Sequence, residues 1–197
     1  MSLVSERFPL GRLIFFVTNN IHKFNEARRV LAQYDIAVAM LRLKPSEIQD
    51  DDIENIAKAS ALEASNRTRL PVIVEDAGLF IDALKGFPGP YSNYAYRTIG
   101  KEGILKLLED CDNRKARFKS VVVFCSPDLG AKCFRGIVEG RISKEVRGES
   151  GFGFDPIFEP EGLSGRTFGE LSIEENNEIS HRSRALRSFA EWYKMRF

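Results

Sequence analysis

A fully apolar run of five residues, LIFFV at positions 13–17, constrains the fold more than any other stretch. A strand is apolar at every position mainly when both faces of its sheet are covered, as in parallel sheets. The run ends in Thr18, Asn19 and Asn20, residue types that favour turns and helix caps. Apolar residues then recur at helical spacing, at Phe24, Ala27, Val30, Leu31 and Tyr34. We therefore expect a strand, a turn and a helix of an α/β fold.

The turn between this strand and this helix is a candidate anion site. The start of a helix presents backbone N–H groups that bind phosphates readily. Lys23 lies just inside the expected helix and is placed to reach such a phosphate. The same lysine is equally consistent with an ordinary exposed side chain on a first helical turn.

Two adjacent carboxylates, Glu75 and Asp76, follow a second apolar run, LPVIV at positions 70–74. We expect a buried strand that ends at these carboxylates, after which Ala77 and Gly78 turn the chain. Ligands of open α/β sheets bind outside the carboxyl ends of the strands. Two carboxylates in that place suit a hard cation such as Mg²⁺, which takes oxygen ligands and substrate phosphates together. The alternative is a solvated acidic turn.

The segment between these two runs predicts one more strand and one more helix. Residues 36–43 have the pattern of a strand, and residues 45–52 form an acidic connection. The helix that follows carries Lys58 on its surface and has apolar or small residues on one face. The aspartates before this helix favour its positive end. The face is formed by Ile53, Ile56, Ala57, Ser60, Ala61 and Ala64.

The second half of the chain has a more antiparallel character. The loop GFPGPYS, residues 86–92, is rigid and apolar, so we expect it to pack against another lobe or a second subunit. Residues 93–110 predict two short helices. Residues 118–124 and 132–138 predict a β-hairpin, and residues 140–146 predict a further strand.

Two stretches near the C-terminus carry candidate binding residues. In GESGFGFDP, residues 148–156, Phe152 and Phe154 are placed either to stack on a base or to fill the core. Ser180 is a candidate N-cap of the last helix. His181 and Arg182 then lie in a first turn, where the helix dipole disfavours cations. They therefore indicate an anionic ligand or a carboxylate partner.

Composition excludes several classes of protein. The net charge is +1, from 29 basic and 28 acidic residues, so binding of nucleic acid through a broad basic surface is not expected. Three cysteines with no CxxC motif argue against a disulfide framework and a zinc site. No apolar run is long enough to span a bilayer, and the first residues lack a signal-peptide core. We expect a soluble, cytoplasmic protein.

Several motifs, taken together and in order, resemble the inosine triphosphate pyrophosphatase family. They are TNNIHK (18–23), VEDAGLFIDALKGFPGPYS (74–92), GFGFDPIF (151–158), TFGEL (167–171) and ISHRSRAL (179–186). The resemblance implies an elongated α/β fold in which a mixed, twisted central sheet is flanked by helices. It implies one domain, residues 1–197, made of two lobes with the active-site cleft between them, and a homodimer. It also implies Mg²⁺-dependent hydrolysis of noncanonical purine nucleoside triphosphates (ITP, dITP, XTP) to the monophosphate and pyrophosphate.

The resemblance assigns roles to residues at the phosphate end of the substrate. Asp76 is the best candidate to orient or deprotonate the attacking water. The metal ligands implied are Glu47, Glu75 and Asp76. Lys23 and, through a gapped alignment, Lys58 resemble lysines that hold the triphosphate, and Thr18 and Asn20 belong to the same substrate-binding turn.

The resemblance also implies a base pocket. Phe152 resembles the aromatic residue that stacks on the base, and the rest of the pocket comprises Phe154, Asp155, Ser180, His181 and Arg182. Three positions depart from the family pattern. Asn19 replaces a glycine, Ala77 replaces a serine that contacts substrate, and Asn176 replaces a lysine that contacts substrate.

Two alternatives remain open from the sequence. One is a related house-cleaning pyrophosphatase that acts on other modified nucleotides. The other is a purine nucleotide sensor without catalytic activity. The set Lys23, Glu47, Glu75 and Asp76 argues against a sensor, since binding alone does not require a full set of metal and water ligands.

Overall fold

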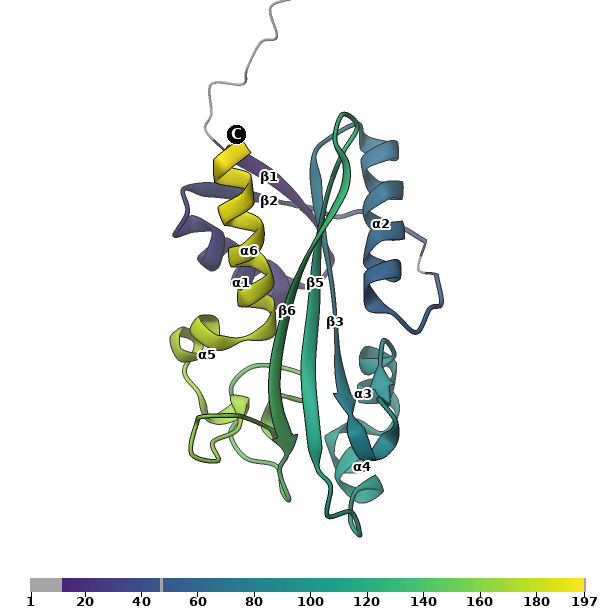
Figure 1. Ribbon diagram of the computed structural model, residues 1–197, viewed down its shortest axis with the longest axis vertical. Helices are drawn as coiled ribbons and strands as arrows, with labels where there is room; N and C mark the ends of the chain where they lie inside the picture. The colour runs from purple at the N-terminus through teal and green to yellow at the C-terminus, as the bar shows by residue number, and fades with distance from the viewer. Residues whose placement is uncertain (1–11, 47, 197) are drawn as a thin grey trace, which may run out of the picture.

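The computed structural model describes residues 12–46 and 48–196, and within them seven strands form one mixed, twisted sheet. The strand order is β2-β1-β3-β5-β6-β7, and the short β4 pairs with β3. The sheet runs the length of an elongated molecule, with helices on both of its faces (Figure 1). This arrangement confirms the expected α/β class. The strands are β1 (Arg12–Val17), β2 (Ile36–Leu41), β3 (Val72–Ile81), β4 (Pro88–Gly89), β5 (Lys115–Ser126), β6 (Gly130–Ile142) and β7 (Phe158–Pro160).

The carboxyl end of β1 is a topological switch point. β1 lies between β2 and β3 and pairs with both in parallel. The chain reaches β2 through α1 (Ile21–Ala32) and then crosses to the other side of β1 through α2 (Ile53–Thr68). Crossovers of one hand to opposite sides of a strand put their helices on opposite faces. Accordingly, α1 and α6 (His181–Arg196) cover one face and α2 covers the other. Sheets of this kind bind ligands at such a point.

β3 is longer than the sequence pattern predicts. The expectation that the strand ends at Glu75 and that Ala77 and Gly78 turn the chain is wrong. β3 continues to Ile81 because its second half pairs antiparallel with β5, with Glu75 opposite Val122 and Ile81 opposite Ala116. On its other side, β3 pairs with β1 at Val72 and Ile73 and with β4 at Leu79 and Phe80. No strand of the described chain pairs with that side of residues 74–78, which faces the switch point.

The antiparallel half confirms the expected hairpin, which β5 and β6 form. The further strand expected at residues 140–146 is wrong. Its first residues are the end of β6, where Gly140–Ile142 pairs with β7. The chain then leaves the sheet, because the Ser143 N–H donates to the Ile157 carbonyl and its hydroxyl donates to the Glu145 carbonyl. The two short helices expected are α3 (Ser92–Thr98) and α4 (Gly100–Leu107), and α5 (Ile173–Ile179) precedes α6.

Buried apolar side chains gather in three clusters. One lies between the sheet and α1 and α6, and a second lies between the sheet and α2. The third cluster, which we call the lower cluster, lies at the other end of the sheet and joins residues of α3 and α4 to residues from 154–171. β3 and β5 contribute residues to all three, so one pair of long strands connects both ends of the molecule. The lower cluster includes Leu79, Ile81, Ile104, Phe118, Phe154, Ile157, Phe158 and Phe168.

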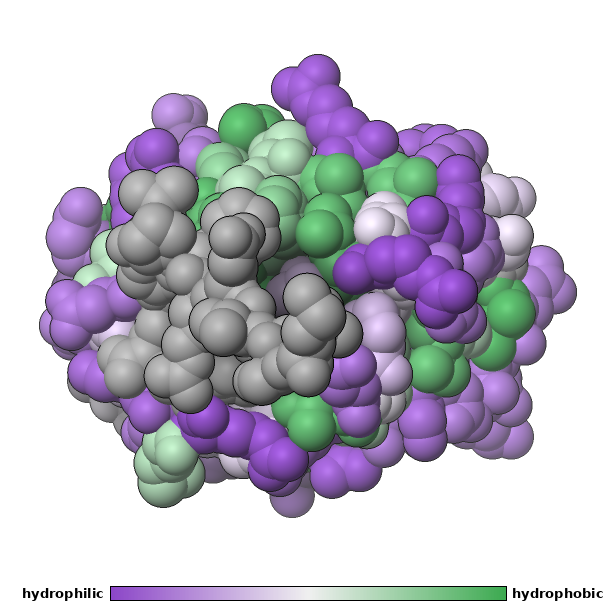
Figure 2. Space-filling model, turned by 90° about the horizontal axis from the view of Figure 1, so that it is seen from above, coloured by the Kyte–Doolittle hydropathy of each residue, from purple (hydrophilic) through white to green (hydrophobic). Residues whose placement is uncertain are grey.

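The surface carries one conspicuous aromatic segment. Phe87 and Tyr91, from the loop 86–92 expected to pack against another lobe or a second subunit, are 41% and 43% exposed, and Tyr94 of the following α3 is 63% exposed. Figure 2 shows another face, the end seen from above, where hydrophilic side chains form most of the rim around a smaller hydrophobic area. Within residues 12–46 and 48–196, no helix combines the length and the apolar character that crossing a membrane requires.

Candidate active site

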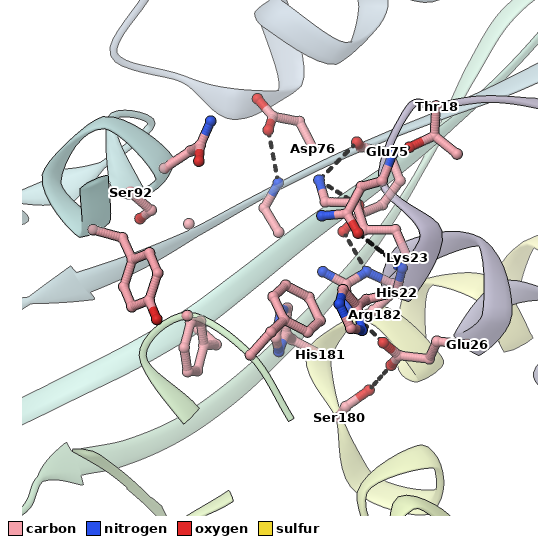
Figure 3. A pocket seen from close by; sticks show the side chains of 18 of the residues that line it. Thr18, His22, Lys23, Glu26, Glu75, Asp76, Ser92, Ser180, His181 and Arg182 are labelled. Atoms are coloured by element: carbon pink, nitrogen blue, oxygen red, sulfur yellow. Dashed lines mark hydrogen bonds and ion pairs between the residues drawn. The ribbon is translucent and has the colours of Figure 1, made fainter. Parts of the chain in front are cut away.

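A cavity of about 1470 Å³ opens at the carboxyl end of β1. Its walls come from the β1–α1 turn, the middle of β3, the start of α3, residues 150–155 and the junction between α5 and α6. Segments that are far apart in the sequence therefore meet at the switch point (Figure 3). The predicted site residues Thr18, Asn20, Lys23, Glu75, Asp76, Ala77, Phe152, Phe154, Asp155, Asn176, Ser180, His181 and Arg182 all line this cavity.

Asn20 is the N-cap of α1. Its side-chain oxygen accepts hydrogen bonds from the N–H groups of His22, at 2.9 Å, and Lys23, at 3.3 Å. The Asn20 N–H in turn donates to the Thr18 hydroxyl at 3.1 Å. The Asn20 cap thus already pairs with two of the first-turn N–H groups that we expected, from the sequence, to bind an anion. The positive charge this turn presents to the cavity is therefore chiefly that of Lys23.

Lys23 reaches from α1 across to β3. Its Nζ lies 2.8 Å from Oε2 of Glu75 and donates to the Glu75 carbonyl oxygen at 3.3 Å. The side chain is 20% exposed, so the ammonium is accessible from the cavity while it is anchored to the strand.

The adjacent carboxylates Glu75 and Asp76 point to opposite faces of the sheet. Side chains alternate along a strand, and their partners on β5 confirm the sides. Val122, opposite Glu75, belongs to the cluster under α1 and α6, whereas Val121, opposite Asp76, belongs to the cluster under α2. Figure 3 shows Asp76 across β3 from the group of charged residues around Glu75. The two carboxylates therefore do not act as one paired ligand.

Asp76 is half-buried on the cavity wall. One of its oxygens, Oδ1, accepts a hydrogen bond from the Ala77 N–H at 2.9 Å, which fixes the orientation of the carboxylate. This part of β3 pairs with β5 on one side, and on its other side it lies beside the turn after β1 and lines the cavity. Asp76 therefore presents a carboxylate to whatever occupies the cavity.

Glu75 is fully buried and ionised. Its Oε1 accepts from the Ser120 hydroxyl at 2.7 Å and from Nε of Arg182 at 3.0 Å, while Oε2 faces Lys23. Burial alone raises the pKa of this carboxyl, but Arg182 and Lys23 outweigh it and lower the pKa to about 2.

Arg182 is the centre of the buried network. Its side chain is 3% exposed and forms ion pairs with Glu75 and with Glu26 of α1. The Ser180 hydroxyl also donates to Glu26, at 2.6 Å. Burial disfavours the charged guanidinium, yet Glu26 and Glu75 raise the pKa of Arg182 above its usual value. The cation at this helix start therefore has carboxylate partners, one of the two explanations the sequence left open.

His181 is held neutral. Burial, and then the neighbouring Arg182, lower the pKa of this imidazole to about 3. The ring stacks on Phe118, with centroids 4.6 Å apart and 9° between the planes. Its Nδ1 is buried and has no hydrogen-bond partner within residues 12–46 and 48–196. An unsatisfied buried nitrogen on a cavity wall is suited to bind a polar group of a ligand. The predicted cap is confirmed, because the Ser180 hydroxyl accepts from the Ser183 N–H at 3.0 Å.

The stretch 150–155 supplies the aromatic wall. Phe152 is half-buried, with the His22 imidazole stacked 5.4 Å away and the Arg182 guanidinium 5.2 Å from the ring centroid. Phe154 is 4% exposed and belongs to the lower cluster, so it is mainly a core residue that reaches the cavity. Asp155 accepts from the Phe152 N–H at 2.9 Å, and burial raises the pKa of its carboxyl to about 7.

One predicted residue that the structure describes stands apart from the cavity. Lys58 lies exposed on α2, one position after Ala57, whose side chain lines the cavity. Successive helical residues point about 100° apart, which turns Lys58 to solvent. Glu47 lies outside the described residues. Asn176, on α5, is half-buried at the cavity edge.

Sequence reasoning missed His22 and Glu26. Both line the cavity, and both lie on α1 close to Lys23. Glu26 is three residues after Lys23, a spacing that places two side chains on one side of a helix. That spacing was the available signal.

The described residues fit a magnesium ion held jointly with a substrate. No three His, Cys, Asp or Glu side chains of residues 12–46 and 48–196 gather as a metal site. Mg²⁺, however, is usually bound by one or two carboxylates together with waters and substrate phosphates. Asp76 supplies a carboxylate of this kind on the cavity wall.

The comparisons with known proteins agree with this α/β architecture and its site at the switch point. The dITP/XTP pyrophosphatase of Methanopyrus kandleri is 54% identical over 92% of this chain and 96% of its own length. That of Thermococcus kodakarensis is 50% identical over 91% of this chain and 96% of its own. The solved structure of the Staphylococcus aureus Ham1 protein covers 94% of this chain and 100% of its own, with a TM-score of 0.82 and 30% identity.

A sequence profile of the Ham1 family matches residues 14–192. The chain belongs to the Ham1 family. The family resemblance recognised in the sequence motifs is thereby confirmed.

Proposed function

We propose that this protein hydrolyses noncanonical purine nucleoside triphosphates (dITP, ITP and XTP) to the nucleoside monophosphate and pyrophosphate, with Mg²⁺. One observation carries the proposal. The residues that line the one cavity include a lysine and a carboxylate, Lys23 and Asp76, and also the aromatic and polar side chains of Phe152 and His181. A triphosphate and a purine base require these two chemistries in one cleft. Relatives of about 50% identity are named dITP/XTP pyrophosphatases, which supports the same substrate class.

The phosphate end of the site promotes attack of water on the α-phosphorus. Lys23 neutralises charge on the phosphates, and Asp76 orients the water and accepts its proton at a carboxylate oxygen. The bond between the α-phosphorus and the oxygen that bridges to the β-phosphorus breaks, and pyrophosphate leaves. A bound Mg²⁺, held by Asp76 and, as the family resemblance implies, by Glu47, would neutralise phosphate charge and position the phosphate oxygens. Glu75, the third ligand implied, already has Lys23 and Arg182 on its oxygens.

The base end selects the 6-oxo purine edge. Hypoxanthine and xanthine carry an oxygen at position six and a proton on N1, whereas adenine carries an amino group and an unprotonated N1. A buried wall with His181, Asp155 and Ser180 that pairs with the first pattern leaves polar groups unpaired when adenine enters. The neutral His181 offers one nitrogen donor and one acceptor to that edge.

Three wider features belong to the same proposal. The two ends of the sheet act as lobes of one domain, with the cleft between them. The exposed Phe87, Tyr91 and Tyr94 form part of a homodimer interface, since aromatic residues are enriched in such interfaces. The protein works in the cytoplasm, where nucleotide pools are maintained.

The test is release of pyrophosphate from dITP, ITP, XTP, ATP and GTP, each with and without Mg²⁺. We expect metal-dependent release from the first three and almost none from ATP and GTP. Guanine shares the 6-oxo edge, so its exclusion must depend on its 2-amino group. The substitution Asp76→Asn should lower kcat by about 10²–10⁴-fold while nucleotide binding persists. Binding of ITP without release from any triphosphate would leave a nucleotide sensor instead. Equal release from all five would retain the chemistry and remove our account of the base pocket.

A further inference from the structure

Glu75 occupies a position that neither metal binding nor substrate contact explains. Its side chain is 0% exposed, and its two oxygens face two cations that come from opposite ends of the chain. Lys23 of α1 lies 2.8 Å from Oε2, and Nε of Arg182 of α6 lies 3.0 Å from Oε1. A metal ion at Glu75 would have to displace one of these cations.

We propose that Glu75 is a positioning residue that couples the phosphate end of the site to the base end, through Lys23 and Arg182. The proposal rests on the proposed function in one respect: it takes Lys23 as a phosphate ligand and Arg182 as part of the base pocket. A ligand bound at the phosphate end then changes the affinity of the base end for its own ligand, and the reverse also holds.

The charges of the network give the coupling a sign. Lys23 and Arg182 are balanced by Glu75 and Glu26. A triphosphate attracts the Lys23 ammonium and weakens its hold on Glu75. The buried carboxylate cannot be solvated, so Arg182 becomes its principal cation. Arg182 lies 5.2 Å from the ring of Phe152, and a firmer hold on Arg182 therefore orders the base wall. Bound phosphates should raise the affinity for the base, and by linkage the bound base should raise the affinity for phosphates.

The alternation of β3 explains how two adjacent carboxylates take separate tasks. Asp76 lies on the other face of the sheet and serves the water and the metal, while Glu75 is sealed among Lys23, Arg182 and Ser120. Replacement of Glu75 should therefore change the communication between the two ends, an effect distinct from loss of a metal ligand.

The experiment measures binding of two fragments by calorimetry without divalent metal, so that nothing is hydrolysed. Inosine probes the base end and inorganic tripolyphosphate probes the phosphate end. In the unaltered protein, saturating tripolyphosphate should lower the Kd of inosine by about fivefold or more. The quantity compared is the ratio of the inosine Kd without tripolyphosphate to the inosine Kd with it. In Glu75→Gln this ratio should fall to about one. The matched control is Glu26→Gln, which loosens Arg182 from its other carboxylate. It should weaken inosine binding and keep the ratio above one.

A second variant tests the sign and does not depend on the stability of Glu75→Gln. Lys23→Met leaves Glu75 with Arg182 alone, as a bound triphosphate would. It should bind tripolyphosphate weakly and bind inosine about fivefold more tightly than the unaltered protein does without phosphate. A purely structural role of the network would weaken both ligands and leave the ratio unchanged.

A ratio of one in the unaltered protein, or weaker inosine binding in Lys23→Met, would overturn the proposal. These outcomes are separable from failure of the proposed function. If Mg²⁺-dependent pyrophosphate release from dITP persists, only the coupling role of Glu75 is removed. If that release is absent, the proposed reaction itself is lost.

Discussion

His181 shows how a titratable residue is accommodated in the first turn of a helix, where a positive charge is unfavourable. A protonated histidine in the first turn of α6 would oppose the helix dipole. Burial and Arg182 instead keep the imidazole neutral, and its ring stacks on Phe118. The charge at this helix start is left to Arg182, which two carboxylates compensate. The cost of a neutral buried histidine is sensitivity to acid.

The free energy of unfolding should reveal this sensitivity. The ordinary pKa of histidine is 6.5, and in the folded protein the pKa of His181 is about 3. Between these values the unfolded chain binds a proton that the folded chain does not, so stability falls as the pH is lowered. At pH 5 the loss due to His181 is about 2 kcal/mol.

His181→Phe retains the stacking and removes the titration. Between pH 7.5 and pH 5 the variant should therefore lose about 2 kcal/mol less stability than the unaltered protein, as measured by urea denaturation. Asp155 titrates in the opposite direction, and the comparison of the two proteins cancels its contribution. The same loss in both proteins would show that His181 is protonated in the folded state.

The site was only partly accessible from the sequence. Motif order brought Lys23, Asp76, Phe152 and Arg182 to one cleft, because motifs identify residues regardless of where strands end. Glu26 was missed because its one signal, the spacing of three residues from Lys23, also fits an ordinary surface pair on a helix. The opposite orientation of the two acidic side chains was missed for a different reason. It follows from strand alternation, and β3 was expected to end where they begin.

At the scale of elements, the contact between β6 and α6 fixes the part of the cavity wall that carries His181 and Arg182. Gly136 of β6 lies against the first turn of α6. A Cβ at this glycine would lie 2.0 Å from the His181 carbonyl oxygen and 2.7 Å from the Ala185 nitrogen. The absence of a side chain lets the helix approach the sheet closely enough to bury His181 and Arg182.

Gly136→Ala should therefore push the start of α6 away from the sheet. We expect a loss of about 3 kcal/mol in the free energy of unfolding, measured in urea, and a raised KM for dITP. Gly130→Ala, on the same hairpin, is the matched control. A Cβ there would meet nothing within 4 Å, although φ is +67°. It should cost about 1 kcal/mol and leave KM unchanged. Equal effects of the two substitutions would contradict the close approach as the cause.

The sequence predicted the elements better than it predicted their ends. The first strand and helix, the hairpin and the last helix have strong periodicity, and each is present. The errors fall where long-range pairing overrides local pattern. Ala77 and Gly78 favour a turn, yet β5 holds them in β3 opposite Ser120 and Lys119. No local signal contains that pairing, since the two segments are about 40 residues apart.

At the scale of the whole molecule, the two ends of the sheet should fold as one unit. β3 and β5 supply side chains to the cluster under α1 and α6, to the cluster under α2 and to the lower cluster. A continuous pair of strands transmits the loss of packing at one end to the other. The cavity then lies against these shared strands, since residues of β3 and Phe118 of β5 line it.

A substitution that destabilises the lower cluster should consequently destabilise the other end of the sheet as well. Ile157 is fully buried there, and Ile157→Ala should cost about 3 kcal/mol. Trp192, the single tryptophan, packs against the cluster of α1 and α6 at the opposite end. Its fluorescence and the far-ultraviolet circular dichroism should report one coincident, shifted urea transition. Val30→Ala, at the tryptophan end, is the control and should shift both signals together. If Ile157→Ala leaves the urea transition of the tryptophan fluorescence unshifted, the two ends of the sheet unfold separately.

The opposite orientation of Glu75 and Asp76 limits how the chain length can vary. Three residues, 69–71, connect α2 to β3. An insertion or deletion of one residue there that slid β3 by one position along β5 would exchange the faces of the two carboxylates. Asp76 would then be sealed under α6, and Glu75, the buried partner of Arg182, would point toward α2. Such a connection tolerates changes of residue type far better than changes of length.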